Sequence, residues 1–281
     1  MVTPSYNQGR FIEQTITSVL GQSYPNLEYM VLDGGSTDET VEVIERYQKH
    51  LSFWRSERDR GQSAAVNEGF ARATGDILCW LNSDDMYLPG ALDFVARTLE
   101  VGRAHLLFGN CVQIRENAEG VSWSTVVETQ RTRDIGWMDY VVQPSSFWTR
   151  AAWEATGPLD EAMHYVFDWD WFIRAAREQV KFEATTRHLS VYRIHDAHKT
   201  GTGGEPRDRE IEAIYARHQG AQAAALFRAL CERRPLITNA MRVLSRARLG
   251  KAAPGLLRLL APGAARGLSQ REIGGILAMV M

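Results

Sequence analysis

Two adjacent carboxylates, Asp84 and Asp85, follow the hydrophobic run ILCWL at residues 77–81 after two polar residues. Adjacent carboxylates repel each other unless a cation or a hydrogen-bond donor lies between them. Hard oxygen ligands favour Mg²⁺ or Mn²⁺, and such ions usually also hold the phosphates of a substrate. The pair therefore predicts a metal site for a phosphate-bearing ligand, and the alternative is that Asp85 only caps a following helix.

Two further polar clusters follow earlier apolar runs, at residues 3–7 (TPSYN) and 33–36 (DGGS). Because ligands of open parallel sheets bind at the carboxyl ends of the strands, we expect these clusters and residues 82–85 to meet at one site. Taken singly, each cluster is equally typical of a turn. The chain has no G-x-x-x-x-G-K-[ST] sequence and no G-x-G-x-x-G after the first run, so a metal is the expected means of holding phosphate.

Short apolar runs alternate with helical spacing over the first hundred residues. Strands are expected at 27–32, 77–81 and 106–108, with residues 1–3 as the end of another strand. Helices are expected near 12–20, 41–47 and 65–73, and this rhythm predicts a parallel sheet covered on both faces. A capping-box pattern at 36–39 predicts a helix directly after Asp33, and Pro89 is expected in the first turn of a helix reaching Leu99. Residues 109–149 are β-like, and 168–178 return to helical spacing.

The composition is that of an ordinary globular protein, with 281 residues, 44% of them hydrophobic and 23% charged. These values exclude collagen-like, coiled-coil and mainly disordered chains. Three cysteines without metal-like spacing predict neither a disulfide framework nor a zinc site, and favour a reducing, cytoplasmic environment. No run approaches the roughly 18 apolar residues of a spanning helix, and Met1 leads directly into a polar loop, unlike a signal peptide.

Charge divides the chain into two parts. Residues 1–206 carry a net charge of −10 and residues 207–281 carry +8, with a glycine-rich loop or boundary at 199–206. The basic tail has helical spacing, which leaves two alternatives. Its apolar faces and arginines can bind an anionic membrane surface, or its helices can dock on the rest of the chain while the arginines remain solvated. The acidic body and the absence of a recognition motif argue against nucleic acid.

The combined motifs resemble the inverting family 2 glycosyltransferases with a GT-A fold. The resemblance rests on TPSYNQGRFIEQTITSVLGQSYPNLEYMVLDGGSTDET, RGQSAAVNEGFARATGDILCWLNSDDMYLPGAL, QPSSFW, FDWDWFIRA and YRIH, covering about residues 1–200. It implies an α/β fold with a mostly parallel central sheet flanked by helices and a helical C-terminal extension. The implied domains are a catalytic domain at 1–206, with a nucleotide-sugar half at about 1–109 and an acceptor half at about 110–206, and the extension at 207–281.

The resemblance assigns the donor site residue by residue. The nucleobase and ribose are expected against Thr3, Pro4, Ser5, Tyr6 and Asp33. The family's Asp-x-Asp motif matches Asn82-Ser83-Asp84, where Asn82 replaces the first carboxylate. Asn82 can still hydrogen-bond a ribose hydroxyl but brings no charge, which leaves Asp84 as the expected metal ligand with Asp85 in support.

The resemblance also assigns a catalytic base, Asp168, which opens a helix in the second half. A carboxylate there takes the proton of the acceptor hydroxyl as it attacks the anomeric carbon, and a metal stabilises the leaving diphosphate. A single displacement of this kind inverts the anomeric configuration. Asp170 lies two positions on and faces elsewhere on the helix. The alternative for Asp168 is a helix cap.

Other candidates have equally plain alternatives. Gln62 and Asn67 match a segment that lines the donor pocket, or form an exposed helix start. Trp148 stacks on an acceptor sugar or is a core residue, and Gln143 is expected on the same acceptor side. His195 and Lys199 reach the diphosphate when the glycine-rich loop closes, or His195 is structural.

The expected function is a Mn²⁺- or Mg²⁺-dependent inverting transfer from a nucleotide-sugar, most often a UDP-sugar, to a saccharide or lipid-linked acceptor in surface polysaccharide assembly. The expected location is cytoplasmic, at the inner face of the membrane. One alternative is a non-catalytic nucleotide-sugar-binding module, which Asn82 permits. The other is a sugar-1-phosphate nucleotidyltransferase, against which the single glycine in TPSYNQGR counts.

Overall fold

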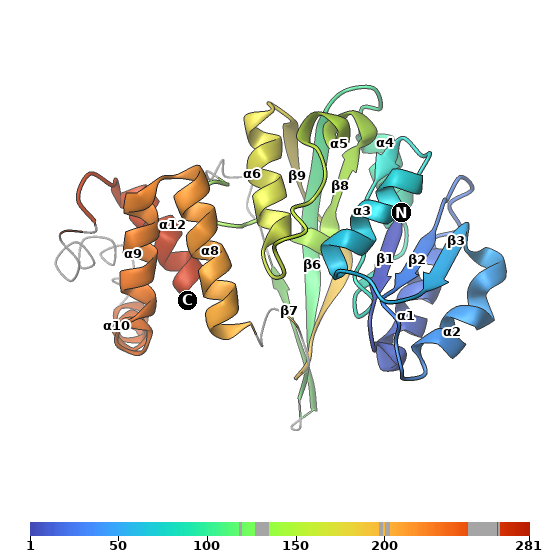
Figure 1. Ribbon diagram of the computed structural model, residues 1–281, viewed down its shortest axis with the longest axis horizontal. Coiled ribbons are helices and arrows are strands. Elements are labelled where there is room, and N and C mark those ends of the chain that lie inside the picture. The colour runs from blue at the N-terminus through green and yellow to red at the C-terminus, as the bar shows by residue number, and fades with distance from the viewer. Residues whose placement is uncertain (118–119, 127–134, 197–198, 200–202, 247–262, 264) are drawn as a thin grey trace. The chain divides into compact units, whose positions relative to one another are not determined.

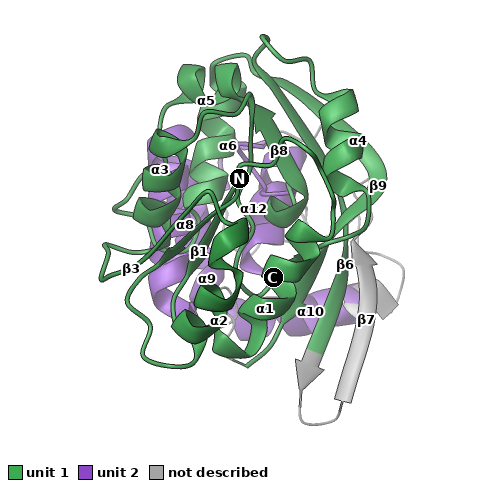
Figure 2. Ribbon diagram, turned by 90° about the vertical axis from the view of Figure 1, so that its right-hand side faces the viewer, with its two compact units in different colours: residues 1–131, 141–202 green, residues 132–140, 203–281 purple. Residues whose placement is uncertain are grey.

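The computed structural model describes residues 1–281 apart from 118–119, 127–134, 197–198, 200–202, 247–262 and 264. The chain divides into two compact units (Figure 2). Unit 1 comprises Met1–Arg131 and Val141–Thr202, and unit 2 comprises Thr132–Tyr140 and Gly203–Met281. Every residue predicted above to do chemistry lies in unit 1.

Unit 1 begins with a parallel three-stranded sheet in the order β1–β2–β3 (Figure 1). The register pairs Ser5 of β1 with Asp33 of β2, and Asp33 with Ser56 of β3. Three polar residues therefore end the three strands side by side, at the edge where parallel sheets bind ligands. The strands are Val2–Ser5 (β1), Met30–Asp33 (β2) and Phe53–Ser56 (β3).

A second, mixed sheet has the order β4–β8–β6–β9–β5, with β7 paired to β6. Strands β6 and β9 are parallel, whereas β8 and β5 run antiparallel to their neighbours. A parallel bridge between Val2 and Trp80 joins the two sheets. The strands are Ile77–Leu78 (β4), Met86–Tyr87 (β5), His105–Asn117 (β6), Gly120–Val126 (β7), Ser146–Thr149 (β8) and Lys181–Ile194 (β9).

Helices cover the sheets through regularly spaced apolar residues. Helix α1 places Ile12, Ile16 and Val19 in a core with Val31 of β2, as their helical spacing predicts. Helix α3 packs on β1 at Gly69, where a Cβ atom would lie only 2.4 Å from Val2 Cγ2. The helices of unit 1 are Gly9–Leu20 (α1), Thr40–Tyr47 (α2), Gln62–Arg72 (α3), Ala91–Thr98 (α4), Arg150–Thr156 (α5) and Phe167–Arg177 (α6), with 3₁₀ turns at Gln48–His50 and Gln143–Ser145.

Aromatic side chains from α3, α6 and β8 pack into one cluster. Phe70 lies edge-on to Trp148, with ring centroids 5.9 Å apart, and Trp148 lies 4.7 Å from Trp171. Phe167, the first residue of α6, lies 6.0 Å from Trp80. The first turn of α6 is therefore held beside the chain that leads into residues 82–85.

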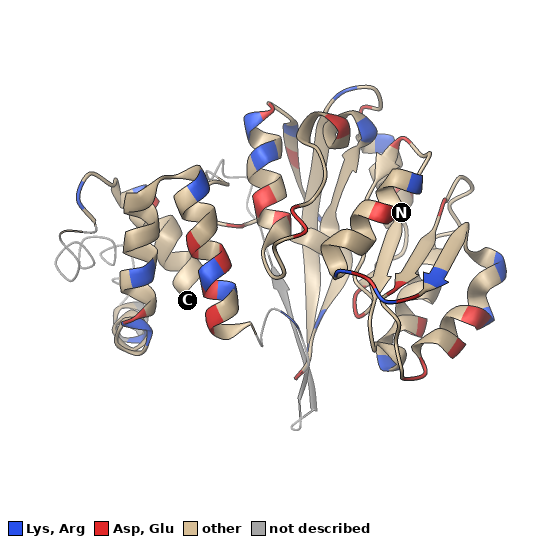
Figure 3. Cartoon of the chain, in the orientation of Figure 1, with Lys and Arg blue, Asp and Glu red and all other residues tan. Residues whose placement is uncertain are grey.

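Unit 2 has a helical core of its own. Buried residues of α8, α9 and α12 include Tyr215, Phe227 and Ile276, and Tyr215 Oη donates to the carbonyl of Trp137 at 2.8 Å. Basic and acidic residues are interspersed on its helices (Figure 3), and two pairs are Arg228–Glu212 and Arg234–Asp208. No helix within the described ranges is long and apolar enough to cross a membrane. The helices are Gly204–His218 (α8), Ala221–Cys231 (α9), Arg234–Arg246 (α10) and Gln270–Val280 (α12).

The predicted alternation of strands and helices is confirmed, but several boundaries are wrong. The strand at 77–81 is interrupted, because Ile77 and Leu78 pair with β8 whereas Trp80 bridges to Val2. The helix expected near Pro89 begins only at Ala91. Strand β3 was not predicted, and the expected boundary at residue 206 falls inside α8. The tail arginine at position 248 lies outside the described residues, as does the side chain of Arg246.

The predicted capping box is also wrong. Ser36 Oγ donates to Asp33 Oδ1 at 2.5 Å instead of capping a helix, and α2 begins at Thr40. Asp38 accepts from the Thr40 backbone N–H at 3.1 Å and from Gly9 N–H at 3.0 Å. Residues 36–39 therefore tie the loop after β2 to the start of α1.

Candidate active site

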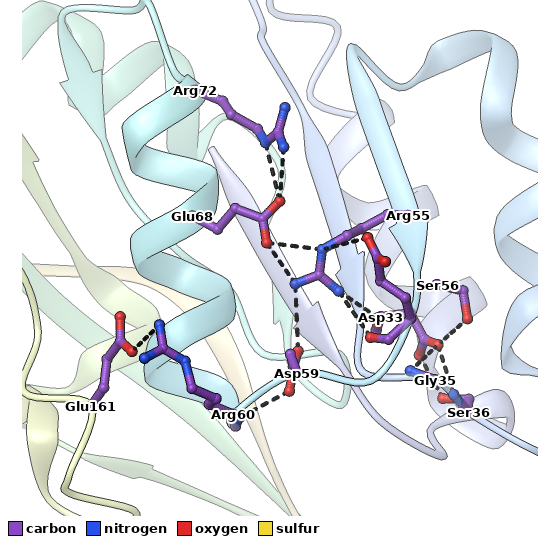
Figure 4. Close-up of polar contacts among 12 residues, drawn as sticks. Asp33, Gly35, Ser36, Arg55, Ser56, Asp59, Arg60, Glu68, Arg72 and Glu161 are labelled. Atoms are coloured by element: carbon purple, nitrogen blue, oxygen red, sulfur yellow. Dashed lines mark hydrogen bonds and ion pairs between the residues drawn. The ribbon is translucent and has the colours of Figure 1, made fainter.

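The loop after β2 is organised around the carboxylate of Asp33, which is fully buried (Figure 4). Its Oδ2 accepts from the backbone N–H of Gly35 at 3.1 Å and of Ser36 at 2.8 Å, and from Ser56 Oγ at 2.6 Å. Gly35 has a φ of 84°, which aims successive N–H groups at one oxygen. With Ser36 Oγ on Oδ1, four protein donors engage the carboxylate, three of them at Oδ2, so Asp33 shapes the loop.

Arg55 braces this loop from strand β3, a role that sequence reasoning missed (Figure 4). Its Nη1 donates to the Asp33 carbonyl at 2.9 Å, and its Nε and Nη2 donate to Glu68 Oε2 at 2.9 and 2.7 Å. Desolvation is the largest single influence on Arg55 and opposes its charge, but the hydrogen bonds to Glu68 and the charges of Glu68, Asp59 and Glu57 together outweigh it and raise the pKa of the guanidinium. The available signal was the sequence FWRS, whose two aromatic residues favour a strand, and the register shows that this strand ends level with Asp33.

The four predicted donor residues of β1 and its loop differ in exposure. Thr3 and Pro4 are buried, and Thr3 Oγ1 lies 3.1 Å from Tyr29 Oη. Ser5 Oγ is buried and has no hydrogen-bond partner among the described residues. Tyr6 is 60% exposed. Ser5 and Tyr6 are therefore the members of this group that a ligand can reach or satisfy, whereas Thr3 belongs to the core.

Asp84 faces His195, and these two residues form the clearest candidate for binding a cation. His195 Nε2 lies 3.2 Å from Asp84 Oδ2, and the side chains are 5% and 15% exposed. The His195 ring packs on Phe11 with centroids 4.5 Å apart, which holds the imidazole in place. Pairing of Met86 in β5 with Val191 in β9 brings the two loops together.

Asp85, predicted to support Asp84 as a metal ligand, has both carboxylate oxygens hydrogen-bonded to the protein. It is fully buried, with Oδ1 accepting from Arg193 N–H at 3.0 Å and Oδ2 from Asn82 Nδ2 at 3.3 Å. Burial, and then the Asp84 carboxylate, raise the pKa of Asp85 well above its usual value. Asp85 also caps no helix, since α4 begins at Ala91. It ties the loop to β9 just before His195.

A row of side-chain amides runs beneath this loop. Lys199 Nζ donates to Gln62 Oε1 at 2.9 Å, and Gln62 Nε2 donates to Asn82 Oδ1 at 2.6 Å. Asn82 Nδ2 donates to Gln143 Oε1 at 3.3 Å, and Gln143 Nε2 donates to the Trp80 carbonyl at 2.9 Å. Gln143, predicted on the acceptor side, is 8% exposed, and its side chain supports Asn82. Ser83 is buried too, and its carbonyl accepts from Thr15 Oγ1 at 2.9 Å.

Asp168 is the second residue of α6, so it is not the helix cap. Its Oδ1 accepts from the Trp169 N–H at 2.9 Å, and the preceding Phe167 lies under Lys199 Nζ at 5.4 Å. Asp168 therefore starts a helix beside the amide row. Asp170 is fully buried and paired with Arg174 at 2.9 Å, in line with the prediction that the two carboxylates have different surroundings.

Two predicted ligand contacts are replaced by structural ones. Trp148 is fully buried in the aromatic cluster, so it has no ring face for an acceptor sugar, and the core alternative holds. Asn67 donates to the Leu159 carbonyl at 3.0 Å and accepts from the Leu159 N–H at 2.9 Å. Its amide thus anchors the segment before α6 instead of facing a nucleotide.

The donor set fits a divalent cation shared with a ligand. Asp84 supplies a carboxylate oxygen and His195 an imidazole nitrogen, 3.2 Å apart. Within the part of the chain that the structure describes, no group of three or more His, Cys, Asp or Glu residues is placed to hold a metal ion. An ion bound here would complete its coordination with water and with ligand oxygens such as phosphate.

Known proteins are similar in sequence to this region. The family model described as Glycosyl transferase family 2 matches residues 1–151. The GalNAc(5)-diNAcBac-PP-undecaprenol beta-1,3-glucosyltransferase of Campylobacter jejuni is 31% identical over 120 residues, 41% of this chain and 38% of that protein. The Escherichia coli UDP-Glc:alpha-D-GlcNAc-diphosphoundecaprenol beta-1,3-glucosyltransferase WfgD is 29% identical over 119 residues, 42% of this chain and 47% of that protein. The chain thus spans less than half the length of these two relatives.

Solved structures share the fold. TarS 1–349 of S. aureus in complex with UDP-GlcNAc has a TM-score of 0.64 at 16% identity, covering 98% of this chain and 88% of that one. The mannosyltransferase PcManGT from Pyrobaculum calidifontis in complex with GDP-Man and Mn²⁺ has a TM-score of 0.60 at 19% identity, covering 98% and 84%. The chain has the GT-A fold and belongs to glycosyl transferase family 2.

Proposed function

We propose that this chain is a metal-dependent inverting glycosyltransferase that moves a sugar from a UDP-sugar to a hydroxyl of a saccharide or lipid-linked acceptor. The observation that carries the proposal is the convergence of Asp84 and His195, 3.2 Å apart, in the loop that the amide row links to the first turn of α6. One cluster can hold a diphosphate through a cation, and Asp168 can accept a proton nearby.

The donor's nucleoside is proposed to lie against the loops after β1 and β2. The buried Ser5 hydroxyl has no partner among the described residues, Tyr6 is exposed for stacking, and Asn82 Oδ1 can accept a second hydrogen bond, from a ribose hydroxyl. The preference for uridine draws on the name of WfgD, which includes UDP-Glc, and on TarS, which was solved with UDP-GlcNAc. PcManGT was solved with GDP-Man, so the base needs a direct test.

In the proposed reaction, the acceptor oxygen bonds to the anomeric carbon while its proton passes to the Asp168 carboxylate. The bond between the anomeric carbon and the diphosphate oxygen breaks at the same time, and its electron pair leaves with the nucleoside diphosphate. A divalent cation between Asp84 and His195 would neutralise the charge that this leaving group gains. Lys199 adds a positive charge from the other side of the amide row. A single displacement assisted by one base inverts the configuration at the anomeric carbon.

Thermal unfolding with a panel of nucleoside diphosphates tests donor binding first. A ligand that binds only the folded protein at 100 times its Kd stabilises it by about 2.7 kcal/mol. We expect UDP with Mn²⁺ to raise the Tm, and EDTA to remove most of the shift. If no nucleoside diphosphate raises the Tm, the proposed function is wrong.

Sugar transfer by Asp168→Asn tests the base. Losing a general base lowers kcat by about 10²- to 10⁴-fold, and we expect the Tm and UDP binding to stay at wild-type values. Near-normal turnover would remove Asp168 from this role. UDP binding by a wild-type protein that transfers no sugar from any donor of a panel would favour a non-catalytic binding module.

Unit 2 is proposed to contact an anionic membrane surface, at the inner face of the membrane. On α10, Leu236 is 71% exposed and Arg242 is also exposed, as is Arg233 just before the helix. Each basic residue near such a surface contributes about 1 kcal/mol. Two relatives are named for undecaprenol-linked acceptors, which fits this location. We expect co-sedimentation with anionic liposomes at low salt, weakened by Leu236→Glu, and absence of binding by the wild type would dismiss the proposal.

A further inference from the structure

Every hydrogen bond in the amide row has its donor on the Lys199 side and its acceptor on the Trp80 side. The groups at the two ends of the row allow only this direction. The Lys199 ammonium can only donate, and the Trp80 carbonyl can only accept. Gln62 must therefore turn its oxygen to Lys199 and its nitrogen to Asn82. Asn82 must in turn present its oxygen to Gln62 and its nitrogen to Gln143.

This direction fixes what Asn82 offers to Asp85. The Nδ2 group of Asn82 lies 3.3 Å from both Gln143 Oε1 and Asp85 Oδ2. It serves two acceptors with its two hydrogens, while Oδ1 takes the hydrogen of Gln62 Nε2. An aspartate at position 82 has no hydrogen to give, so it would set an acceptor against two acceptors in a largely buried site.

Asp85 passes this constraint on to the proposed cation site. Its other oxygen accepts from the Arg193 N–H at 3.0 Å, two residues before His195. Asp84 is the residue before it, and its carboxylate faces His195. Asp85 is fully buried, and its position thus sets the spacing of Asp84 and His195.

We propose that Asn82 is a positioning residue whose amide, and not a carboxylate, is required at the first place of the Asn82-Ser83-Asp84 motif. Its oriented amide holds Asp85, and Asp85 holds the loop that presents Asp84. This inference rests on the proposed function for its effect on donor binding. The charge of the ligands alone predicts the opposite result, namely that an aspartate at position 82 strengthens cation binding, because an added carboxylate strengthens a cation site.

The Asn82→Asp variant separates the two expectations. We expect the Tm without ligand to fall by about 5 °C and the Kd for UDP with saturating Mn²⁺ to rise about tenfold, since buried acceptors lose their donor. Asn26→Asp is the matched control, because Asn26 is exposed and the same isosteric change there should leave both values unchanged. An Asn82→Asp protein with unchanged Tm and equal or tighter binding would overturn the proposal.

Reversing the pair tests whether polarity is the cause. In Asn82→Asp/Asp85→Asn, the new amide at 85 can donate to the carboxylate at 82 while its oxygen still accepts from Arg193 N–H. Asp85→Asn alone sets two amide donors against each other. We expect both single variants to lower the Tm and the double variant to regain at least half of the loss. A double variant whose Tm loss equals the sum of the single losses would contradict the proposal.

Gln62→Glu provides a milder test if Asn82→Asp does not fold. A glutamate still accepts from Lys199 but has no hydrogen for Asn82 Oδ1, so we expect UDP with Mn²⁺ to bind about threefold to tenfold less tightly. Unchanged or tighter binding would count against the proposal. The Tm cycle needs no nucleotide, so a wild type that binds no UDP while the cycle shows coupling would refute the proposed function and leave the polarity of the row standing.

Discussion

Asp33 and Asp84 both follow apolar runs of unit 1, but their surroundings differ. Asp33 is fully buried and accepts from four donors that belong to its own loop and to β3. Asp84 is 15% exposed, and the structure pairs it with the imidazole of His195. The Asp33 carboxylate is already engaged by four donors of the protein, whereas the Asp84 carboxylate and its imidazole partner can share a cation.

The difference in surroundings indicates different roles: Asp33 supports the structure of the site, whereas Asp84 can bind a ligand in it. Asp33 fixes the shape of the loop on which a nucleoside is proposed to rest, and Asp84 is proposed to bind the cation. Substitutions of Asp33 should therefore act mainly on stability, and those of Asp84 mainly on activity.

Asp84→Asn should have the largest effect. We expect kcat/KM for sugar transfer to fall by about 10²- to 10³-fold, as for removal of a main charge-stabilising group. The free energy of unfolding should change by less than about 1 kcal/mol, because Asp84 lies at a partly exposed site outside the core. Steady-state kinetics and urea unfolding check the two values, and a variant that loses stability but keeps its activity would break the comparison.

Asp33→Asn should show the reverse pattern. Replacing one acceptor oxygen by an amide nitrogen sets a donor against buried donors, which costs about 1–3 kcal/mol of folding free energy. We expect kcat at saturating donor to stay within about threefold of wild type, because Asp33 touches no reacting atom in the proposed reaction. Urea unfolding and saturation kinetics measure both, and a large loss of kcat without loss of stability would show that Asp33 acts directly.

Ser56→Ala should have a smaller effect of the same kind. It removes one donor, at 2.6 Å, of the four on Asp33 and leaves the three from the loop itself. We expect a loss of about 1 kcal/mol in the free energy of unfolding and no change in kcat. A loss equal to that of Asp33→Asn would mean that β3, and not the loop, holds the carboxylate.

Arg55→Lys should have the smallest effect. A lysine keeps the charge beside Glu68 but loses the bond from Nη1 to the Asp33 carbonyl. That carbonyl still accepts from the Glu57 N–H at 3.1 Å, so it is not left unsatisfied. We expect a loss below about 1 kcal/mol by urea unfolding, and a loss above that of Ser56→Ala would make Arg55 the main support of the loop.

The sequence predicted where the site lies better than what each residue does in it. The strand that ends at Asp33 and the polar cluster after the first strand follow from apolar runs bounded by polar residues, which are local patterns, although β1 reaches Ser5 and not only residue 3. The orientation of Asp85 depends on the Arg193 N–H, 108 positions along the chain, and no local pattern records such a contact.

Two other open or wrong interpretations, at Trp148 and at residues 36–39, have the same physical cause. A tryptophan such as Trp148 can stack on a sugar, but whether its ring is exposed depends on packing against Phe70 and Trp171 from other elements. The sequence at 36–39 fits a capping box, in which the Ser36 hydroxyl would accept from a backbone N–H of the helix. In the structure this hydroxyl instead donates to the charged Asp33 carboxylate, which forms the stronger hydrogen bond. Long-range partners decide between readings that are locally equal.

Calorimetric titration of Mn²⁺ into the protein with UDP present tests the central claim most directly. The account predicts saturable binding near one ion per chain for the wild type and for Asp33→Asn. It predicts at least a tenfold loss of Mn²⁺ affinity for Asp84→Ala, a difference of about 1.4 kcal/mol. An Asp84→Ala protein that binds Mn²⁺ as tightly as the wild type would contradict the account.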